Sequence, residues 1–227
     1  MDFFRELSGR RVFHELQLIL QEENPAAAVS RLNDFGLLRV VHPGLACDKR
    51  MLGLLSGVKQ VVSWFDLLFL NESYMKWAVY FLALIHRCDT DQAGDLCRRF
   101  ELAPRLQALF VEERARAEEC LHGLSRKLPA EPSRVYHLLN GMRTELVLFM
   151  MAAAEQEQVK KAISHYFTSL RRTAISLNGR DLKALGVSPG PVYGRVLRSV
   201  LDARLNGRVN TREEELELAR ELVRAAG

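Results

Sequence analysis

The chain has 227 residues, of which 48% are hydrophobic and 26% are charged, with a formal net charge of +4. This composition is typical of a soluble protein that buries a core. No uninterrupted apolar run of about 18 residues is present, and the N-terminus lacks the pattern of a secretion signal, so we expect no membrane span and a cytoplasmic protein.

The cysteines do not form a recognisable metal or disulfide pattern. Cys47, Cys88, Cys97 and Cys120 include no Cys-x-x-Cys pair and no grouping with histidine that is typical of zinc. We interpret them as reduced thiols, mostly core fillers, and expect no metal site.

In the N-terminal half, apolar residues recur at helical spacing, with stretches of charged residues between them. Residues 37–43 are expected to form a short connection, and residues 103–124 a long amphipathic helix whose charged residues mostly face solvent. The predicted helices cover residues 5–22, Asn24-Pro25 to Gly36, 51–70, 74–85, a segment capped by Asp89, and 103–124.

The C-terminal half continues the helical pattern. Helices are predicted over residues 131–140, 141–155 and 157–172, and a last helix begins after Asn210-Thr211. No segment is convincingly β. The sequence predicts an all-α protein, an elongated helical array with a C-terminal tail that resembles a helix-hairpin-helix.

The tail centres on residues 177–195, which predict two short helices around a glycine-rich hairpin. Asn178 can cap the first helix, and Gly186 can end it in a left-handed conformation. Ser188, Pro189 and Pro191 can start the second helix, because proline suits a first helical turn. The free N–H groups at such a helix start can bind phosphate, so we predict a backbone-phosphate binding element.

Basic residues are concentrated in the same region. Residues 159–208 contain ten Lys/Arg but only two acidic residues, Asp181 and Asp202, so this stretch carries +8 and the rest of the chain −4. Such a local excess is typical of a surface that binds a polyanion, although a basic face without a ligand is the alternative.

The search for an active site is largely negative. The sequence has no P-loop, no Gly-x-Gly-x-x-Gly after a strand, no His-Glu-x-x-His and no Gly-x-Ser-x-Gly. Asp89 and Asp91 are the closest aspartate pair, and we interpret them as a helix cap. His86 is followed by Arg87, so the His-Asp pair of metal phosphohydrolases is missing there.

Two stretches resemble one enzyme family. Ser8–Leu16, Asn24-Pro25 and residues 32–38 are similar to the RNA-binding neck of tRNA nucleotidyltransferases and bacterial poly(A) polymerases. The segment Gly179-x-Asp181-Leu182-x-x-Leu185-Gly186, with Pro189-Gly190-Pro191, Gly194, Asp202 and Asn206-Gly207, resembles their C-terminal tail. The tail match is the more specific, because several glycines and prolines fall in register with the two-helix geometry.

The resemblance implies a neck, body and tail without a catalytic head. The β-sheet head that carries the family's metal-binding Asp-x-Asp pair is missing, since the Asp89-x-Asp91 spacing is interpreted as a helix cap, and the Glu-Asp-x-x-Arg element is absent. Gly9-Arg10 stands where a glutamate usually precedes the arginine at Arg11. The expected parts are a partial neck (1–45), a helical body (46–158) and a basic helical tail (159–227). This fragment would be inactive alone and hold no cofactor, whereas ATP or CTP and Mg²⁺ are implied for the missing head. Whether the parent adds CCA, the terminal A or a poly(A) tail stays open.

The resemblance also implies a role: the chain would hold tRNA or another structured RNA by backbone contacts and position its 3′ end toward the enzyme's own catalytic head. The candidate RNA-binding residues are Arg171, Arg172, Arg180, Lys183, Gly186, Gly190, Gly194, Arg195 and Arg198.

Two other functions stay open. The chain could be a non-catalytic all-α scaffold that docks a protein partner through its apolar middle, which carries Trp64 and Trp77. A degenerate His-Asp phosphohydrolase domain is a weaker possibility.

Overall fold

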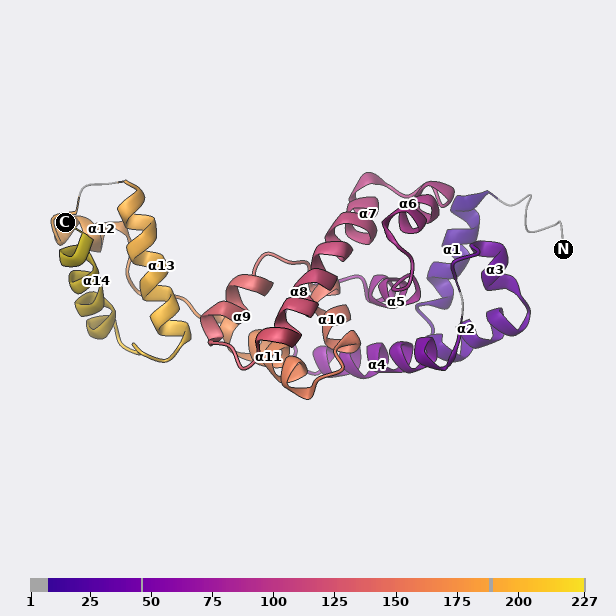
Figure 1. Ribbon diagram of the computed structural model, residues 1–227, viewed down its shortest axis with the longest axis horizontal. Coiled ribbons are helices and arrows are strands. Elements are labelled where there is room, and N and C mark those ends of the chain that lie inside the picture. Colours follow the sequence, from indigo (N-terminus) through magenta and orange to yellow (C-terminus); the bar gives the residue numbers. More distant parts are fainter. Residues whose placement is uncertain (1–7, 46, 188–189, 227) are drawn as a thin grey trace. The chain divides into compact units, whose positions relative to one another are not determined.

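The structure, a computed structural model, describes residues 8–45, 47–187 and 190–226. Every regular element in these ranges is a helix, which confirms the all-α prediction (Figure 1). The helices form two compact units: a first unit with the described residues up to Arg126 and Met142–Lys160, and a second unit with Lys127–Gly141 and the described residues from Lys161 onward. None of the helices in these ranges combines the length and apolar character needed to span a membrane.

The first unit contains most of the longer apolar helices. They are α1 (Gly9–Ile19), α2 (Pro25–Asp34), α3 (Leu37–Val41), α4 (Lys49–Asp66), α5 (Lys76–Leu84), α6 (Thr90–Arg99), α7 (Pro104–Ala108), α8 (Arg114–Lys127) and α10 (Thr144–Ala153). A π-helical turn, Leu109–Glu113, joins α7 to α8. These bounds confirm the predicted helices apart from their ends, except that residues 5–7 of the first predicted helix lie outside the described residues.

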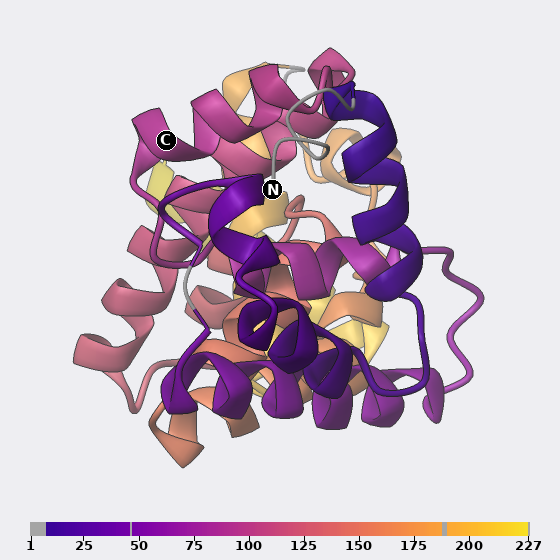
Figure 2. The same cartoon turned by 90° about the vertical axis from the view of Figure 1, so that its right-hand side faces the viewer.

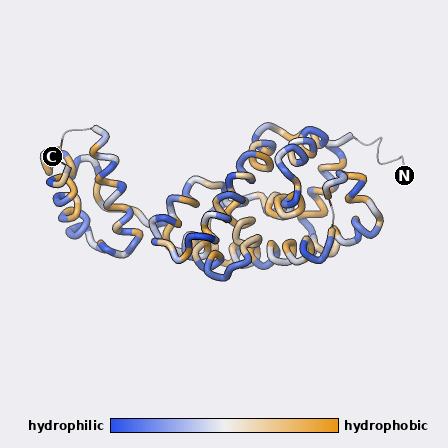
Figure 3. Tube along the Cα trace, viewed as in Figure 1, coloured by the Kyte–Doolittle hydropathy of each residue, from blue (hydrophilic) through white to orange (hydrophobic). Residues whose placement is uncertain are grey.

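Helix α5 forms the centre of this unit. Its residues from Trp77 to Leu84 are all buried, and it packs against both α4 and α10. In the two ribbon views α5 lies between α4 on one side and α6 and α7 on the other, and its trace is mostly hydrophobic in colour (Figures 1, 2 and 3). A helix that is apolar on all sides is stable only when it is enclosed.

An aromatic cluster joins α5 to its neighbours. Phe13 of α1 lies 5.6 Å from the Trp77 ring and 5.7 Å from the Phe81 ring, and Phe110 lies 4.6 Å from Phe81. Because the Trp77 side chain is 8% exposed, it is part of the core. The hypothesis that Trp77 belongs to a docking surface is therefore wrong.

The expected connection over residues 37–43 is instead partly helical. Gly36 takes a left-handed conformation, with φ of 69°, and the five-residue α3 starts directly after it. The β-branched Val40 and Val41 disfavour a helix locally. Burial of Leu38 and packing of α3 on α2 outweigh that preference.

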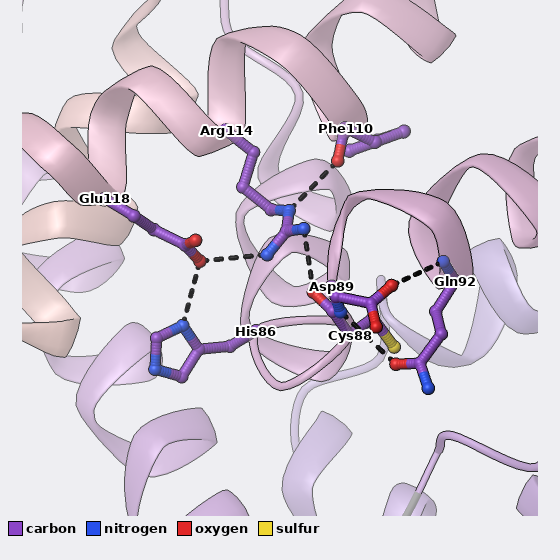
Figure 4. Close-up of polar contacts among 7 residues, drawn as sticks. All are labelled: His86, Cys88, Asp89, Gln92, Phe110, Arg114 and Glu118. Carbon is purple, nitrogen blue, oxygen red and sulfur yellow. Dashed lines mark hydrogen bonds and ion pairs between the residues drawn. The ribbon is translucent and has the colours of Figure 1, made fainter.

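The expected solvated face of residues 103–124 contains one buried arginine. Arg114 is 2% exposed, and its guanidinium donates to the carbonyl oxygens of Phe110 and Cys88 and to the Glu118 carboxylate (Figure 4). The sequence does not indicate this role, because alternating charges on a helix usually indicate a solvent-facing surface. In the same view, the Asp89 carboxylate accepts from the Gln92 amide, which confirms that Asp89 is a cap.

The second unit contains α9 (Pro132–Leu139), most of α11 (Glu157–Thr168), a 3-10 turn (Leu170–Arg172), α12 (Gly179–Ala184), α13 (Pro191–Leu205) and α14 (Arg212–Ala226). Polar contacts fix α13 to α9. The Ser133 amide donates to Asn206 Oδ1 over 2.9 Å, and His137 Nε2 lies 2.5 Å from Asp202 Oδ1. These contacts place α13 so that its outer face stays accessible.

Candidate nucleic-acid interface

Helix α12 is defined by its two ends. The Asn178 side-chain oxygen accepts from the Arg180 amide and the Asp181 carboxylate accepts from the Asn178 amide, each over 2.9 Å, as in a capping box. At the other end Gly186 has a φ of 83°, a left-handed conformation that glycine adopts at little cost. The predicted cap and stop are confirmed.

The second helix of the pair, α13, begins at Pro191 as predicted, with Gly190 at its N-cap position. Gly190 has no side chain, so the N-cap residue itself offers no side-chain cap to the first amides of α13. The predicted contribution of Ser188 and Pro189 lies outside the described residues. The Tyr193 hydroxyl donates to the Val187 carbonyl over 3.0 Å and so ties α13 back to the segment after α12.

A small apolar core joins α12, α13 and α14. Its buried members are Leu177, Leu182, Val196, Val200 and Ala219. Because these side chains face inward, the opposite face of α13 is exposed to solvent, and it carries Gly194, Arg195 and Arg198.

A buried carboxylate connects the helices of this core. Glu215 in the first turn of α14 is fully buried. Its Oε2 accepts from the Ser176 amide over 2.8 Å, and its Oε1 lies 3.3 Å from Nη1 of Arg204 on α13. The sequence indicated only that acidic residues suit the start of a helix. The burial of Glu215 depends on helices distant in sequence, so no local pattern could have revealed it.

A second ion pair connects the ends of α12 and α14. Arg212 Nη2 lies 2.5 Å from Asp181 Oδ1, and Arg212 Nη1 donates to the Ser176 carbonyl over 3.0 Å. Asp181 therefore serves both the capping box of α12 and the joint to α14.

These contacts use both acidic residues of the basic stretch 159–208. Asp181 pairs with Arg212, and Asp202 pairs with His137. Two of the stretch's cations are also used internally, because Arg204 pairs with Glu215 and Arg208 pairs with Glu131 at 2.6 Å.

Five of the eight remaining cations form the surface that we call the arginine face. Each is exposed and has no ion pair or side-chain hydrogen bond with any residue that the structure describes: Arg172, Arg180, Lys183, Arg195 and Arg198. With the two acidic residues of the stretch already paired, this charge is available to an external anion.

Arg171 differs from the arginine face. Its side chain is partly buried, and its guanidinium carbon lies 5.7 Å from the centre of the Phe167 ring. A guanidinium over an aromatic ring gains a cation–π interaction. Arg171 therefore also contributes to the packing of the second unit.

The predicted glycines are all exposed. A Cβ added at Gly186, Gly190 or Gly194 would meet no atom within 4 Å, so these positions leave the backbone open to approach. Only Gly186 requires glycine for its conformation, because Gly190 has an extended backbone that any residue adopts.

Across the described ranges, no three or more His, Cys, Asp and Glu side chains are grouped in a way that could hold a metal ion. The residues present therefore do not fit the Mg²⁺ site that the resemblance implies for a catalytic head, and we assign no metal-dependent step to them.

The chain is similar to known proteins along its length. Residues 3–48 match a family model described as the probable RNA- and SrmB-binding site of polymerase A. An A-adding tRNA nucleotidyltransferase of Geobacter sulfurreducens is 37% identical over 230 residues, which are 100% of this chain and 26% of the relative. A second A-adding enzyme, from Halalkalibacterium halodurans, is 23% identical over 95% of this chain and 47% of its own length.

Solved structures share the fold. The Thermotoga maritima CCA-adding enzyme in complex with tRNA superposes with a TM-score of 0.78 at 22% identity, covering 99% of this chain and 53% of that protein. A CCA-adding enzyme in complex with CTP gives the same TM-score at 21% identity. The chain spans about a quarter to a half of the length of these proteins. The resemblance to tRNA nucleotidyltransferases that was predicted from the sequence is confirmed.

Proposed function

We propose that this chain is the tRNA-binding body and tail of an A-adding tRNA nucleotidyltransferase, and that the arginine face contacts the sugar–phosphate backbone of the tRNA. The observation that carries the proposal is a set of five exposed cations with no ion-pair partner in the described structure, on a chain that is 37% identical to an A-adding enzyme. Backbone contacts position an RNA without reading its sequence.

The geometry of the face suits this role. Arg195 and Arg198 lie one turn apart on α13, and Arg180 and Lys183 lie one turn apart on α12. The exposed backbone at Gly190 and Gly194 lets a phosphate come close to the start of α13, whose amides and dipole favour an anion. The fixed core between the two helices holds these groups in place.

Catalysis would reside outside the residues described. In the proposed assembly, residues 1–45 are a partial neck, 46–158 a body and 159–227 a tail, and a catalytic head would supply the carboxylates for Mg²⁺ and bind ATP. The relatives named as A-adding favour transfer of a single adenosine nucleotide to the tRNA 3′ end. The part described here would position the tRNA for that step.

A charge-reversal experiment tests the RNA-binding surface. Arg195→Glu with Arg198→Glu should weaken tRNA binding roughly 10- to 100-fold at moderate salt, because two phosphate contacts become repulsive. Fluorescence anisotropy with a labelled tRNA measures the effect, and circular dichroism checks that the helical content is unchanged.

The matched control reverses the charge at two other exposed arginines. Arg105 and Arg116 of the first unit also have no ion pair with a described residue, so Arg105→Glu with Arg116→Glu changes the net charge equally. This control should weaken binding less than threefold, roughly the long-range effect of net charge alone. Equal losses in the two double variants would refute a specific RNA surface on α12 and α13.

A further inference from the structure

The first unit contains a pocket of its own, whereas the arginine face belongs to the second unit. It has a volume of about 430 Å³ and opens between the start of α4, the residues after α5 and the end of α10. Its lining includes Arg50, Gly53, His86, Arg87, Ala153 and Glu155. The pocket is within the usual range of small-molecule sites, about 300–1,000 Å³.

Gly53 keeps the pocket open. It lies inside α4, where glycine weakens a helix relative to alanine. Packing does not require it, since a Cβ at Gly53 would meet no atom within 4 Å. Gly57, one turn later, does face a neighbour, because its Cβ would lie 3.4 Å from the Ala152 carbonyl oxygen. The first glycine therefore leaves space that the protein itself does not fill.

One wall of the pocket offers cationic donors. Arg50 is exposed and has no ion pair within the described ranges. Arg87 lies 2.8 Å from Asp48, and that pair orients its guanidinium. A planar guanidinium with several N–H groups suits a phosphate, which it can bind through two parallel hydrogen bonds.

His86 on the same wall is held in a fixed orientation. Its Nδ1–H donates to the Glu118 carboxylate over 3.1 Å (Figure 4). The centre of its ring lies 5.6 Å from the centre of the Phe149 ring. Buried Arg114 fixes Glu118 in turn. The other ring nitrogen, Nε2, has no hydrogen-bond partner among the described residues. A ring positioned by two neighbours with a free nitrogen at a pocket is suited to contact a ligand.

The opposite wall offers acceptors and methyl groups. The last carbonyls of α10 lack intrahelical donors, and the Glu155 carboxylate follows them. Alanine side chains at positions 152–154 line the space between. A carboxylate at this position would repel a bare phosphate, but it can accept from the exocyclic amino group of a base.

We propose that this pocket binds one unpaired nucleotide of an RNA. The phosphate contacts Arg50 and Arg87, the free Nε2 of His86 accepts from a ribose hydroxyl, and the base lies against the alanine methyl groups with its amino group directed to the acceptor wall. Only a base outside a helix can enter such a pocket, as in other single-stranded RNA sites. That the nucleotide belongs to RNA rests on the proposed function, whereas the nucleotide site itself does not.

An NMR titration of the whole chain with AMP tests the site. The Gly53 amide and the His86 ring signals should shift on addition of AMP at millimolar concentration, and inorganic phosphate should bind at least threefold more weakly. Gly53→Leu, which fills the pocket, should remove the shifts. Gly123→Leu is the matched control, because a Cβ at Gly123 of α8 also meets no atom within 4 Å, and it should leave the AMP shifts unchanged.

The outcomes separate this inference from the proposed function. If Gly53→Leu fails to fold, Arg50→Glu replaces it and should weaken AMP binding at least fivefold. Unchanged Gly53 and His86 signals at saturating AMP, or equal binding of AMP and phosphate, would overturn the nucleotide pocket even where tRNA binds normally. AMP shifts in a chain that does not bind tRNA would support the pocket and contradict the proposed function.

Discussion

The core of the first unit and the three-helix core of the second unit are stabilised differently. Around α5 the contacts are apolar and aromatic, with eight consecutive buried residues from Trp77 to Leu84. Around α12, α13 and α14 the apolar core is small, and ion pairs at Glu215 and Arg212 reinforce it. This difference implies that ion pairs contribute more to the stability of the α12–α14 core than to that of the core around α5. The proposed RNA binding of the tail also depends on charge.

The largest effect is expected in the aromatic core. Phe81→Ala should lower the free energy of unfolding by about 3–5 kcal/mol, because it leaves a cavity among Phe13, Phe100 and Phe110. Denaturant unfolding followed by circular dichroism measures this loss. The free energy of unfolding of Phe81→Ala should change little between low and high salt. A loss below about 1 kcal/mol would contradict the view that this cluster is the main core.

A smaller effect is expected from the buried carboxylate of the tail. Glu215→Gln can keep the bond from the Ser176 amide but leaves Arg204 unpaired, so we expect a loss of about 1–3 kcal/mol. Hydrogen exchange of the amides in α12–α14 should accelerate, while exchange in α5 stays as it is. Equal acceleration in both regions would show that the two cores do not differ as described.

The smallest expected effect is on the free energy of unfolding at acidic pH. Backbone amides of Asn210 and Thr211 lower the pKa of Glu214 below its ordinary value of 4.5, and the Met51 amide with Arg87 lowers the pKa of Asp48 below 3.8. A lowered pKa in the folded state adds stability above the unfolded pKa, and that stability is lost as the pH falls through the folded pKa.

Stability should therefore decline below about pH 4, and Glu214→Gln should flatten the decline. Unfolding curves between pH 3 and 6 measure this. A variant whose decline is as steep as that of the parent chain would show that Glu214 does not contribute.

The ends of several helices are encoded by residues adjacent in the sequence, whereas the burial of individual charged side chains is not. The caps at Asn178 and Asp89 and the stop at Gly186 were predicted, because each depends on a few adjacent residues. Arg114 was expected on a mostly solvated face and Glu215 only as a favourable acid at a helix start, and both are buried. Each has a partner 26 to 39 residues away along the chain, Cys88 for Arg114 and Ser176 for Glu215, so only the tertiary structure reveals their burial.

For the candidate site, the sequence predicted which basic residues are involved but not how the nearby charges pair. Charge counting located the basic stretch, and the predicted two-helix hairpin singled out Arg180, Lys183, Arg195 and Arg198 within it. The sequence could not show which acidic residues neutralise which cations. In the structure Asp181 pairs with Arg212 and Asp202 lies against His137, so neither carboxylate pairs with a cation of the arginine face. The pocket at Gly53 was not predicted, because it forms between helices far apart in sequence.

The salt dependence of tRNA binding tests the central claim most directly. If the five cations of the arginine face contact phosphates, log K should fall with log salt concentration with a slope on the order of −4, and Arg195→Glu with Arg198→Glu should reduce its magnitude by about two. A slope near zero, or a slope that the double variant leaves unchanged, would contradict the proposal that this face binds the RNA backbone.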